Sequence, residues 1–150
     1  MNRIPPAALL LALAGLIPFF WGALLVLGLT TGADWTLPAV LTGDGRLLIV
    51  RYGGIILPFV AGTLWGFATK ADGMQAVAAF VLSVLPALWW FFMPGSDAET
   101  ALISLATGFA GLLLIELAFH RWGLTPPWWL ALRTQLTVIV LVCIAVGIWA

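Results

Sequence analysis

The chain has 150 residues, of which 63% are hydrophobic and 8% are charged, and six basic residues balance six acidic ones. Because a soluble domain carries about 25% charged residues, this composition argues against a water-soluble globular domain and indicates a membrane-embedded one. No basic tract is available to neutralise phosphates, so nucleic acid is not expected as a partner. The single cysteine, Cys143, cannot form an intramolecular disulfide and does not support a thiolate metal site.

A helix needs roughly 20 apolar residues to cross the hydrocarbon core of a bilayer. The first such run covers residues 7–29 and is entered through Pro5 and Pro6, residues suited to a helix start. It follows Arg3, as the apolar part of a secretory signal would, but it exceeds the roughly 7–15 apolar residues of such a signal. We therefore predict that this run is the first membrane span.

The region 30–46 is rich in glycine, threonine and aspartate, which predicts a loop. Four further spans are then predicted, at 47–69, 74–93, 98–119 and 128–150. These runs are continuously apolar and do not alternate, so membrane-spanning strands are not expected. The predicted fold class is all-α: a single transmembrane domain over residues 1–150, built as an integral membrane bundle of about five helices.

The basic residues predict the orientation of this bundle. With five spans, one side of the membrane receives Arg3, Lys70, Arg121 and Arg133, whereas Arg46 and Arg51 lie on the other side. Cytoplasmic loops carry an excess of lysine and arginine. The N-terminus is therefore predicted to be cytoplasmic, or in the matrix of a mitochondrion, and the C-terminus to lie on the opposite side.

Three spans carry a proline near the middle, each after two aliphatic residues: Pro18, Pro58 and Pro86. Broken helices of this kind occur in some transporters. Kinked helices packed around one another are the favoured interpretation, because proline is common in membrane spans.

Residue patterns typical of catalysis do not occur. The sequence has no P-loop, no glycine-rich dinucleotide fingerprint, no zinc-protease motif and no nucleophile elbow. One histidine, His120, cannot form a bis-histidine haem site or a zinc cluster within one chain. We therefore predict no enzyme activity, no catalytic residue, no metal site and no cofactor.

Ionisable residues near the membrane are the candidate functional groups. Glu116 lies inside the fourth span, where a carboxylate is costly unless it is paired or hydrated. His120 follows one helical turn later, and Arg133 begins the next span on the same side of the membrane. Two interpretations stay open for these three residues: an interfacial ion pair that fixes how the spans meet, which is favoured, and a proton or ligand relay.

Arg51 lies about one turn inside the second span, on the opposite side of the membrane. Its long side chain can extend to the lipid headgroups. Headgroup contact is the favoured role, and contact with a substrate anion is the alternative.

Small residues allow close approach of membrane helices. The candidate packing positions are Gly54, Gly62, Gly66, Gly108 and Gly111, of which Gly62 and Gly66 form a Gly-x-x-x-Gly motif. Packing within the bundle is the favoured use, and a seam with a second copy or a partner is the alternative.

Several motifs occur in an order that resembles a known family. They are Gly15-Leu16-Ile17-Pro18-Phe19, then Tyr52 followed by residues 56–66, then Ser83-Val84-Leu85-Pro86, and near the end Pro127-Trp128-Trp129 and Leu132-Arg133. Together these resemble the family numbered 3429 among domains of unknown function, which includes transmembrane protein 69 of mitochondria. Pro58, Ala61 and Trp129 depart from its usual pattern. The resemblance implies a five-span protein of the bacterial or mitochondrial inner membrane, and it implies no particular activity or ligand.

Two functions remain open at this point. The favoured one is a structural, assembly or accessory subunit of a larger membrane complex, because catalytic groups are lacking and the loops are short. The alternative is a small transporter or channel that uses Glu116 and its ionisable neighbours. The expected partners are the lipid bilayer and either a larger complex or further copies of this chain.

Overall fold

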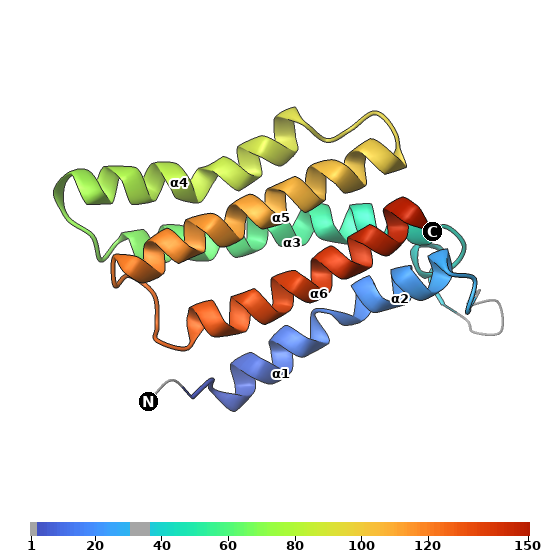
Figure 1. Cartoon of the computed structure of the whole chain (residues 1–150), viewed down its shortest axis with the longest axis horizontal. Coiled ribbons are helices and arrows are strands. Elements are labelled where there is room, and N and C mark those ends of the chain that lie inside the picture. The colour runs from blue at the N-terminus through green and yellow to red at the C-terminus, as the bar shows by residue number, and fades with distance from the viewer. Residues whose placement is uncertain (1–2, 31–36) are drawn as a thin grey trace.

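The computed structural model describes residues 3–30 and 37–150. Within these ranges all regular secondary structure is helical. Five helical segments are long and apolar enough to cross a membrane, which confirms the predicted all-α class and the number of spans. Figure 1 shows these segments lying along one common long axis.

The first span, Pro6–Val26, consists of α1 (Pro6–Ala14) and α2 (Ile17–Val26). The other spans are single helices: α3 (Gly45–Ala68), α4 (Gly73–Phe92), α5 (Ala98–Arg121) and α6 (Trp129–Trp149). A 3-10 helix, η1 (Ala39–Leu41), lies between α2 and α3. The outer bounds of each span lie within three residues of those predicted from the apolar runs.

The break in the first span has a local cause in Pro18. This residue lies in the first turn of α2 and has no N–H to donate to the preceding turn, so the helix cannot run through it undisturbed. At the break, the Tyr52 hydroxyl on α3 donates a hydrogen bond to the carbonyl of Gly15 over 2.8 Å. Phe19 then packs edge-on against the Tyr52 ring, with 5.1 Å between ring centroids. The break is thus held by a specific contact from a neighbouring span.

The other two mid-span prolines lie inside uninterrupted helices. Pro58 is within α3 and Pro86 is within α4. Both helices continue on either side of the proline, so the three prolines do not make a repeated set of broken helices.

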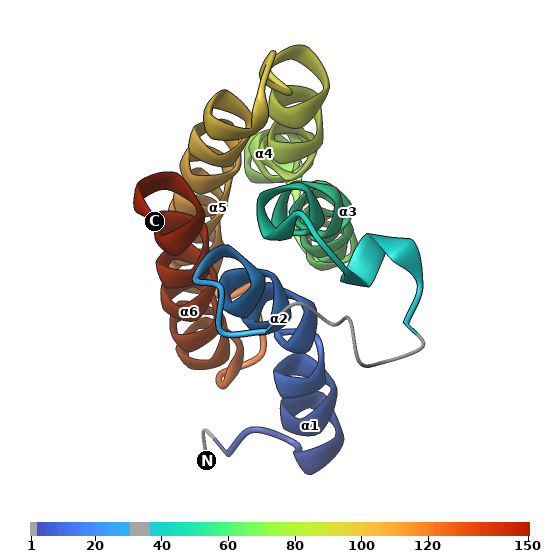
Figure 2. The same cartoon turned by 90° about the vertical axis from the view of Figure 1, so that its right-hand side faces the viewer.

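The centre of the bundle lies between α3, α5 and α6. Its largest fully buried side chains come from these helices and from α2: Phe19, Ile49, Leu57, Leu64, Leu102, Leu105, Phe109, Leu112, Phe119 and Ile144. α4 buries the smallest share of its length and lies at one edge of the bundle, while α1 lies at another (Figure 2). α1 itself contains no buried residue.

The two ends of the bundle are occupied by different connections (Figure 1). The N-terminus, the α3–α4 turn and the α5–α6 connection lie at one end, and the C-terminus lies at the other. This alternation places Lys70, Arg121 and the start of α6 at the same end as Arg3, as expected for five spans. The side of the membrane that this end faces stays a prediction.

The N-terminus of α5 carries a capping box. The Asp97 carboxylate accepts the backbone N–H of Thr100 over 2.9 Å, and the Thr100 hydroxyl accepts the N–H of Asp97 over 3.2 Å. The backbone and side-chain hydrogen bonds from Thr100 hold the pKa of Asp97 below its usual value.

We expect Asp97→Ala to destabilise the protein and Asp97→Asn to be milder, because asparagine also caps helices. The folded-state pKa of Asp97 is lowered, so its contribution to stability is present above the unfolded-state pKa and is lost as the pH falls through the folded-state value. Thermal unfolding in detergent at neutral and at acidic pH measures this. An equal difference between wild type and Asp97→Ala at both pH values would contradict it.

Candidate functional site: a buried ion pair between α5 and α6

Glu116 lies on α5, five residues before the helix ends, and 0% of its surface is exposed. Its carboxylate accepts hydrogen bonds from two side chains of α6. Arg133 Nε lies 3.0 Å from each carboxylate oxygen, and Trp129 Nε1 donates to Oε2 over 2.7 Å. A carboxylate inside a membrane is costly unless it is paired. These donors supply that pairing.

Arg133 is also buried, with 6% of its surface exposed. Its Nη2 donates to Thr137 Oγ1 over 3.3 Å. Trp129, Arg133 and Thr137 follow one another at intervals of four residues on α6, so they lie on one face of that helix. These side chains of α6 thus form a polar row, and the first two of them contact the buried carboxylate of Glu116 on α5.

The pair has two consequences for the bundle. It joins α5 to α6 near their connection, which Figure 1 shows at the N-terminal end of the bundle. It also brings together opposite charges, so the buried group as a whole is neutral. Removing either partner alone would leave an uncompensated charge in a low-dielectric interior, which is far more costly than the pair itself.

His120, the third member of the predicted cluster, does not join the ion pair. It is exposed on the outer side of the bundle, beside Pro127 and Gln135. The step of four residues along α5 turns the helix by about 40° beyond a full circle, which is enough to carry His120 out of the interface. The geometry therefore favours a structural ion pair over a three-residue relay.

No group of three potential metal ligands from His, Cys, Asp and Glu occurs in the part of the chain that the structure describes.

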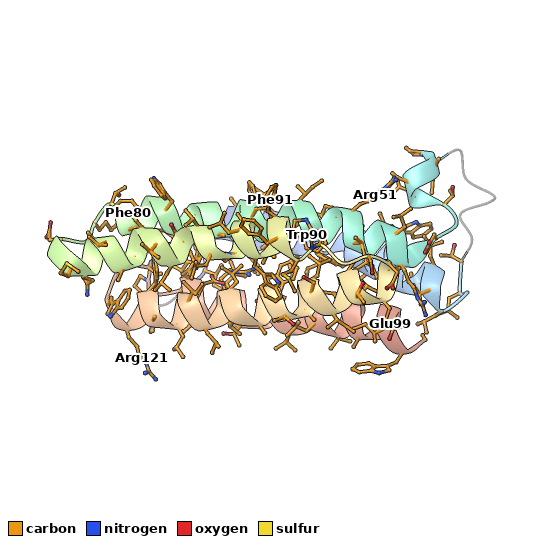
Figure 3. All side chains as sticks on the ribbon, turned by 90° about the horizontal axis from the view of Figure 1, so that it is seen from above. Arg51, Phe80, Trp90, Phe91, Glu99 and Arg121 are labelled. Carbon is orange, nitrogen blue, oxygen red and sulfur yellow. The ribbon has the colours of Figure 1, made fainter. Side chains whose placement is uncertain are left out.

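Arg51 is exposed near the start of α3. Figure 3 shows Arg51 and Arg121 at opposite ends of the bundle. The Asp44 carboxylate nearby accepts the backbone N–H groups of Arg46 and Leu47 and so caps α3. Arg51 stays a candidate for contact with lipid headgroups or an anion at that end.

The five candidate packing glycines divide into two groups. A Cβ at Gly54 would lie 2.7 Å from Trp90 of α4, and one at Gly108 would lie 2.7 Å from Leu57 of α3. These two positions therefore pack helices within the bundle. The remaining three glycines would meet nothing within 4 Å: Gly62, Gly66 and Gly111. The Gly-x-x-x-Gly motif thus lies outside the packed core of this chain.

Sequence reasoning did not find the tightest glycine contact. A Cβ at Gly45, the first residue of α3, would overlap the backbone oxygen of Gly22 and lie 2.8 Å from the backbone nitrogen of Val26 on α2. The two glycines are distant in the sequence and form no motif, so no local signal marks their contact.

Trp129 and Thr137 were also missed as partners of the ion pair. Neither residue is among the candidate site residues of the sequence analysis. The four-residue spacing of Trp129, Arg133 and Thr137 is the signal that could have found them, because it puts three polar groups on one face of an otherwise apolar helix.

A cavity of about 260 Å³ lies beside the ion pair, between α1, α3 and α6. Arg133, Trp129 and Thr63 carry the polar groups of its lining, and most of the other lining residues are apolar, among them Ala12 and Val60. The ion pair thus borders a space that the described residues of the chain do not fill.

We expect Trp129→Phe to lower the free energy of unfolding by about 1.5–3 kcal/mol, the range for hydrogen bonds to charged groups. The substitution keeps an aromatic ring against Phe67 but removes the donor to Glu116. Trp128→Phe is the matched control, because the Trp128 indole donates to no side chain or carbonyl among the described residues. Equal unfolding curves for the two variants in a denaturant titration would contradict the assigned contact.

Comparison with known proteins agrees with this architecture. The family model described as "Protein of unknown function (DUF3429)" matches residues 4–149. The chain belongs to this family. It is also similar to Transmembrane protein 69 of Xenopus tropicalis, with 34% identity over 145 residues that cover 93% of this chain and 52% of that protein. The chain therefore spans about half the length of this curated relative.

No solved structure matches the chain. The family and its relative thus agree with a membrane protein that has several spanning helices, and the family's description names no activity.

Proposed function

We propose that this protein is a structural, assembly or accessory subunit of a larger membrane complex and that it catalyses no reaction of its own. The observation that carries the proposal is the state of Glu116: this buried carboxylate is held by Arg133 and Trp129 in a neutral group that joins α5 to α6. A carboxylate that is bound by two donors of its own chain joins helices and is not free to carry an ion.

The hydroxyl groups of the spans support the same proposal. Four of them donate to a backbone carbonyl: Thr63 to Val60, Ser83 to Phe80, Ser104 to Met93 and Thr107 to Ile103. A transport pathway requires polar groups that can exchange partners with a passing solute. These hydroxyls instead satisfy the backbone of their own chain.

The outer surface of α3 supplies a place where a partner helix could pack. Gly62 and Gly66 leave open space on this surface, and Trp65 between them is 51% exposed. Close approach of membrane helices depends on small residues of this kind. Within the proposal, this surface faces another subunit of the complex.

The second candidate function is a small transporter or channel, and the cavity beside Arg133 is the observation that favours it. A cavity next to buried ionisable groups is a common arrangement in transporters. In this case Glu116 would have to release Arg133 during each cycle. For either function, we propose the inner membrane of a bacterium or of a mitochondrion as the location, with the N-terminus on the cytoplasmic or matrix side.

Purification of the tagged full chain in mild detergent, followed by native sizing and mass spectrometry, tests the proposal. Co-purification of a stoichiometric partner that is lost on Gly62→Leu would support it. Gly111→Leu is the matched control, because this glycine also leaves open space but lies on α5. A lone monomer or homodimer, together with solute flux in liposomes that Glu116→Gln abolishes, would replace the proposal with the transporter.

A further inference from the structure

The cavity beside the ion pair is open towards the lipid between α1 and α3. Leu11 on α1 and Phe59 on α3 both line it, and both are largely exposed, at 74% and 69%. Residues that line a cavity and are also exposed on the outer surface mark its mouth. The mouth therefore opens sideways, where hydrocarbon chains of the bilayer lie.

One guanidinium nitrogen of Arg133, a residue that lines this cavity, takes no part in the hydrogen bonds of the ion pair. Nε is bound to Glu116 and Nη2 to Thr137, whereas Nη1 has no hydrogen-bond partner among the described residues. Nη1 is not completely buried, because Thr125 Oγ1 is the only completely buried side-chain nitrogen or oxygen without a hydrogen-bond partner among these residues. Arg133 is 6% exposed and lines the cavity, so a ligand in the cavity would lie beside the residue that carries this remaining donor.

Charge decides which acceptor suits this donor. Glu116 already neutralises Arg133, so an anionic ligand would bring an uncompensated negative charge into a low-dielectric site. A neutral carbonyl oxygen accepts the hydrogen bond without that cost. The site therefore favours an uncharged acceptor on an apolar chain.

The volume of the cavity and its position along α6 indicate which uncharged ligand fits. At about 30 Å³ for each water-sized group, a volume of about 260 Å³ holds the carbonyl end of one acyl chain. Arg133 lies four residues after the start of α6, which is about 6 Å along the helix axis. Because the apolar span α6 is about as long as the hydrocarbon core is thick, its start is taken as the boundary of that core, and Arg133 then lies about one helical turn from the ester groups of glycerolipids.

We propose that this cavity binds one acyl chain of a membrane glycerolipid and that Arg133 Nη1 donates a hydrogen bond to its ester carbonyl. The Glu116–Arg133 pair would then serve two purposes, joining α5 to α6 and holding the guanidinium in position for the lipid. This inference is independent of the proposed accessory role, because a lone monomer could bind the lipid equally well.

The test compares dioleoyl phosphatidylcholine with its ether-linked analogue, which has the same headgroup and chain length but no ester carbonyl. Each lipid is titrated into the delipidated full chain in detergent, and native mass spectrometry measures the bound fraction. A hydrogen bond to a charged donor predicts binding of the ester lipid that is about ten-fold stronger or more. Equal binding of the two lipids would overturn the proposal, as would stronger binding of an oleate anion than of the ester lipid.

A variant that fills the cavity provides a second test of the same proposal. Ala12→Phe should lower binding of the ester lipid about ten-fold, because Ala12 lines the cavity on α1. Ala14→Phe is the matched control, since Ala14 is exposed on the same helix and does not line the cavity. Ala8→Phe, at another lining position, replaces Ala12→Phe if that variant unfolds at a lower temperature than wild type. Unchanged binding in a folded cavity-filling variant would overturn the proposal.

Discussion

Replacement of Arg133 by methionine is expected to lower the free energy of unfolding by about 3–5 kcal/mol, the cost of breaking a buried ion pair from one side. Methionine fills a similar volume, so the loss of packing is small. The cost arises because Glu116, with 0% of its surface exposed, keeps only the Trp129 indole as a donor. Unfolding by titration with a denaturing detergent, followed by circular dichroism, measures the change.

The double variant Glu116→Leu with Arg133→Met is expected to recover most of this loss. Replacing both members of a buried pair by apolar residues is often neutral or stabilising. If the double variant is as unstable as Arg133→Met alone, the cost does not come from the unpaired carboxylate, and the role assigned to the pair is wrong.

Arg121→Met is the matched control for charge. Arg121 ends α5 and is exposed, and Figure 3 shows its side chain pointing away from the bundle. We expect a change within about 0.5 kcal/mol, as for other surface substitutions. A loss as large as that of Arg133→Met would indicate a general effect of positive charge on stability in detergent.

Gly45→Ala is expected to have the second largest effect, a loss of about 2–3 kcal/mol, at the upper end of the range for overpacking. The added Cβ would overlap the Gly22 carbonyl oxygen and crowd the Val26 nitrogen. Both are backbone atoms, which cannot move away by a change of rotamer as the end of a side chain can. α2 and α3 would have to separate, and the Tyr52 hydrogen bond to Gly15 would weaken with them.

Gly62→Ala is the matched control for this prediction. It lies within the same helix, α3, and its Cβ would meet nothing within 4 Å. Alanine is about 0.5–1 kcal/mol better than glycine inside a helix, so this variant should be as stable as wild type or more so. Thermal unfolding of both variants in one detergent measures the difference. Equal destabilisation would show that the α2–α3 contact is not as close as described.

The composition and the apolar runs determined the fold class and the positions of the spans. With no water in the hydrocarbon core, each apolar run has to satisfy its own backbone, and the helix is the way in which a single segment does so. The terminal bounds of α3, α4, α5 and α6 follow from the same runs and from local signals such as the Asp97 cap, which act over a few residues. Predictions of this kind need no knowledge of neighbouring helices.

The sequence also indicated that Glu116 needs a partner, because a carboxylate inside a membrane span is costly unless it is paired or hydrated. It did not decide which residue that partner is. His120 and Arg133 were both within reach, and the choice depends on the rotation of α5 and α6 about their axes. That rotation is set by the packing of large buried side chains along the whole length of the bundle, such as Phe109 and Phe119 on α5.

The same reason explains why only the tertiary structure revealed the contact of Gly45 with Gly22, the Tyr52 support of the break at Gly15, and the cavity beside Arg133. Each is formed by residues on different helices, and their distances depend on how several helices pack at once. The sequence by itself thus determined that this protein is a five-span helical membrane protein, because lipid acts on each segment separately. The tertiary structure decided which polar groups meet inside the bundle and which surfaces stay open, because those contacts exist only after the helices have packed together.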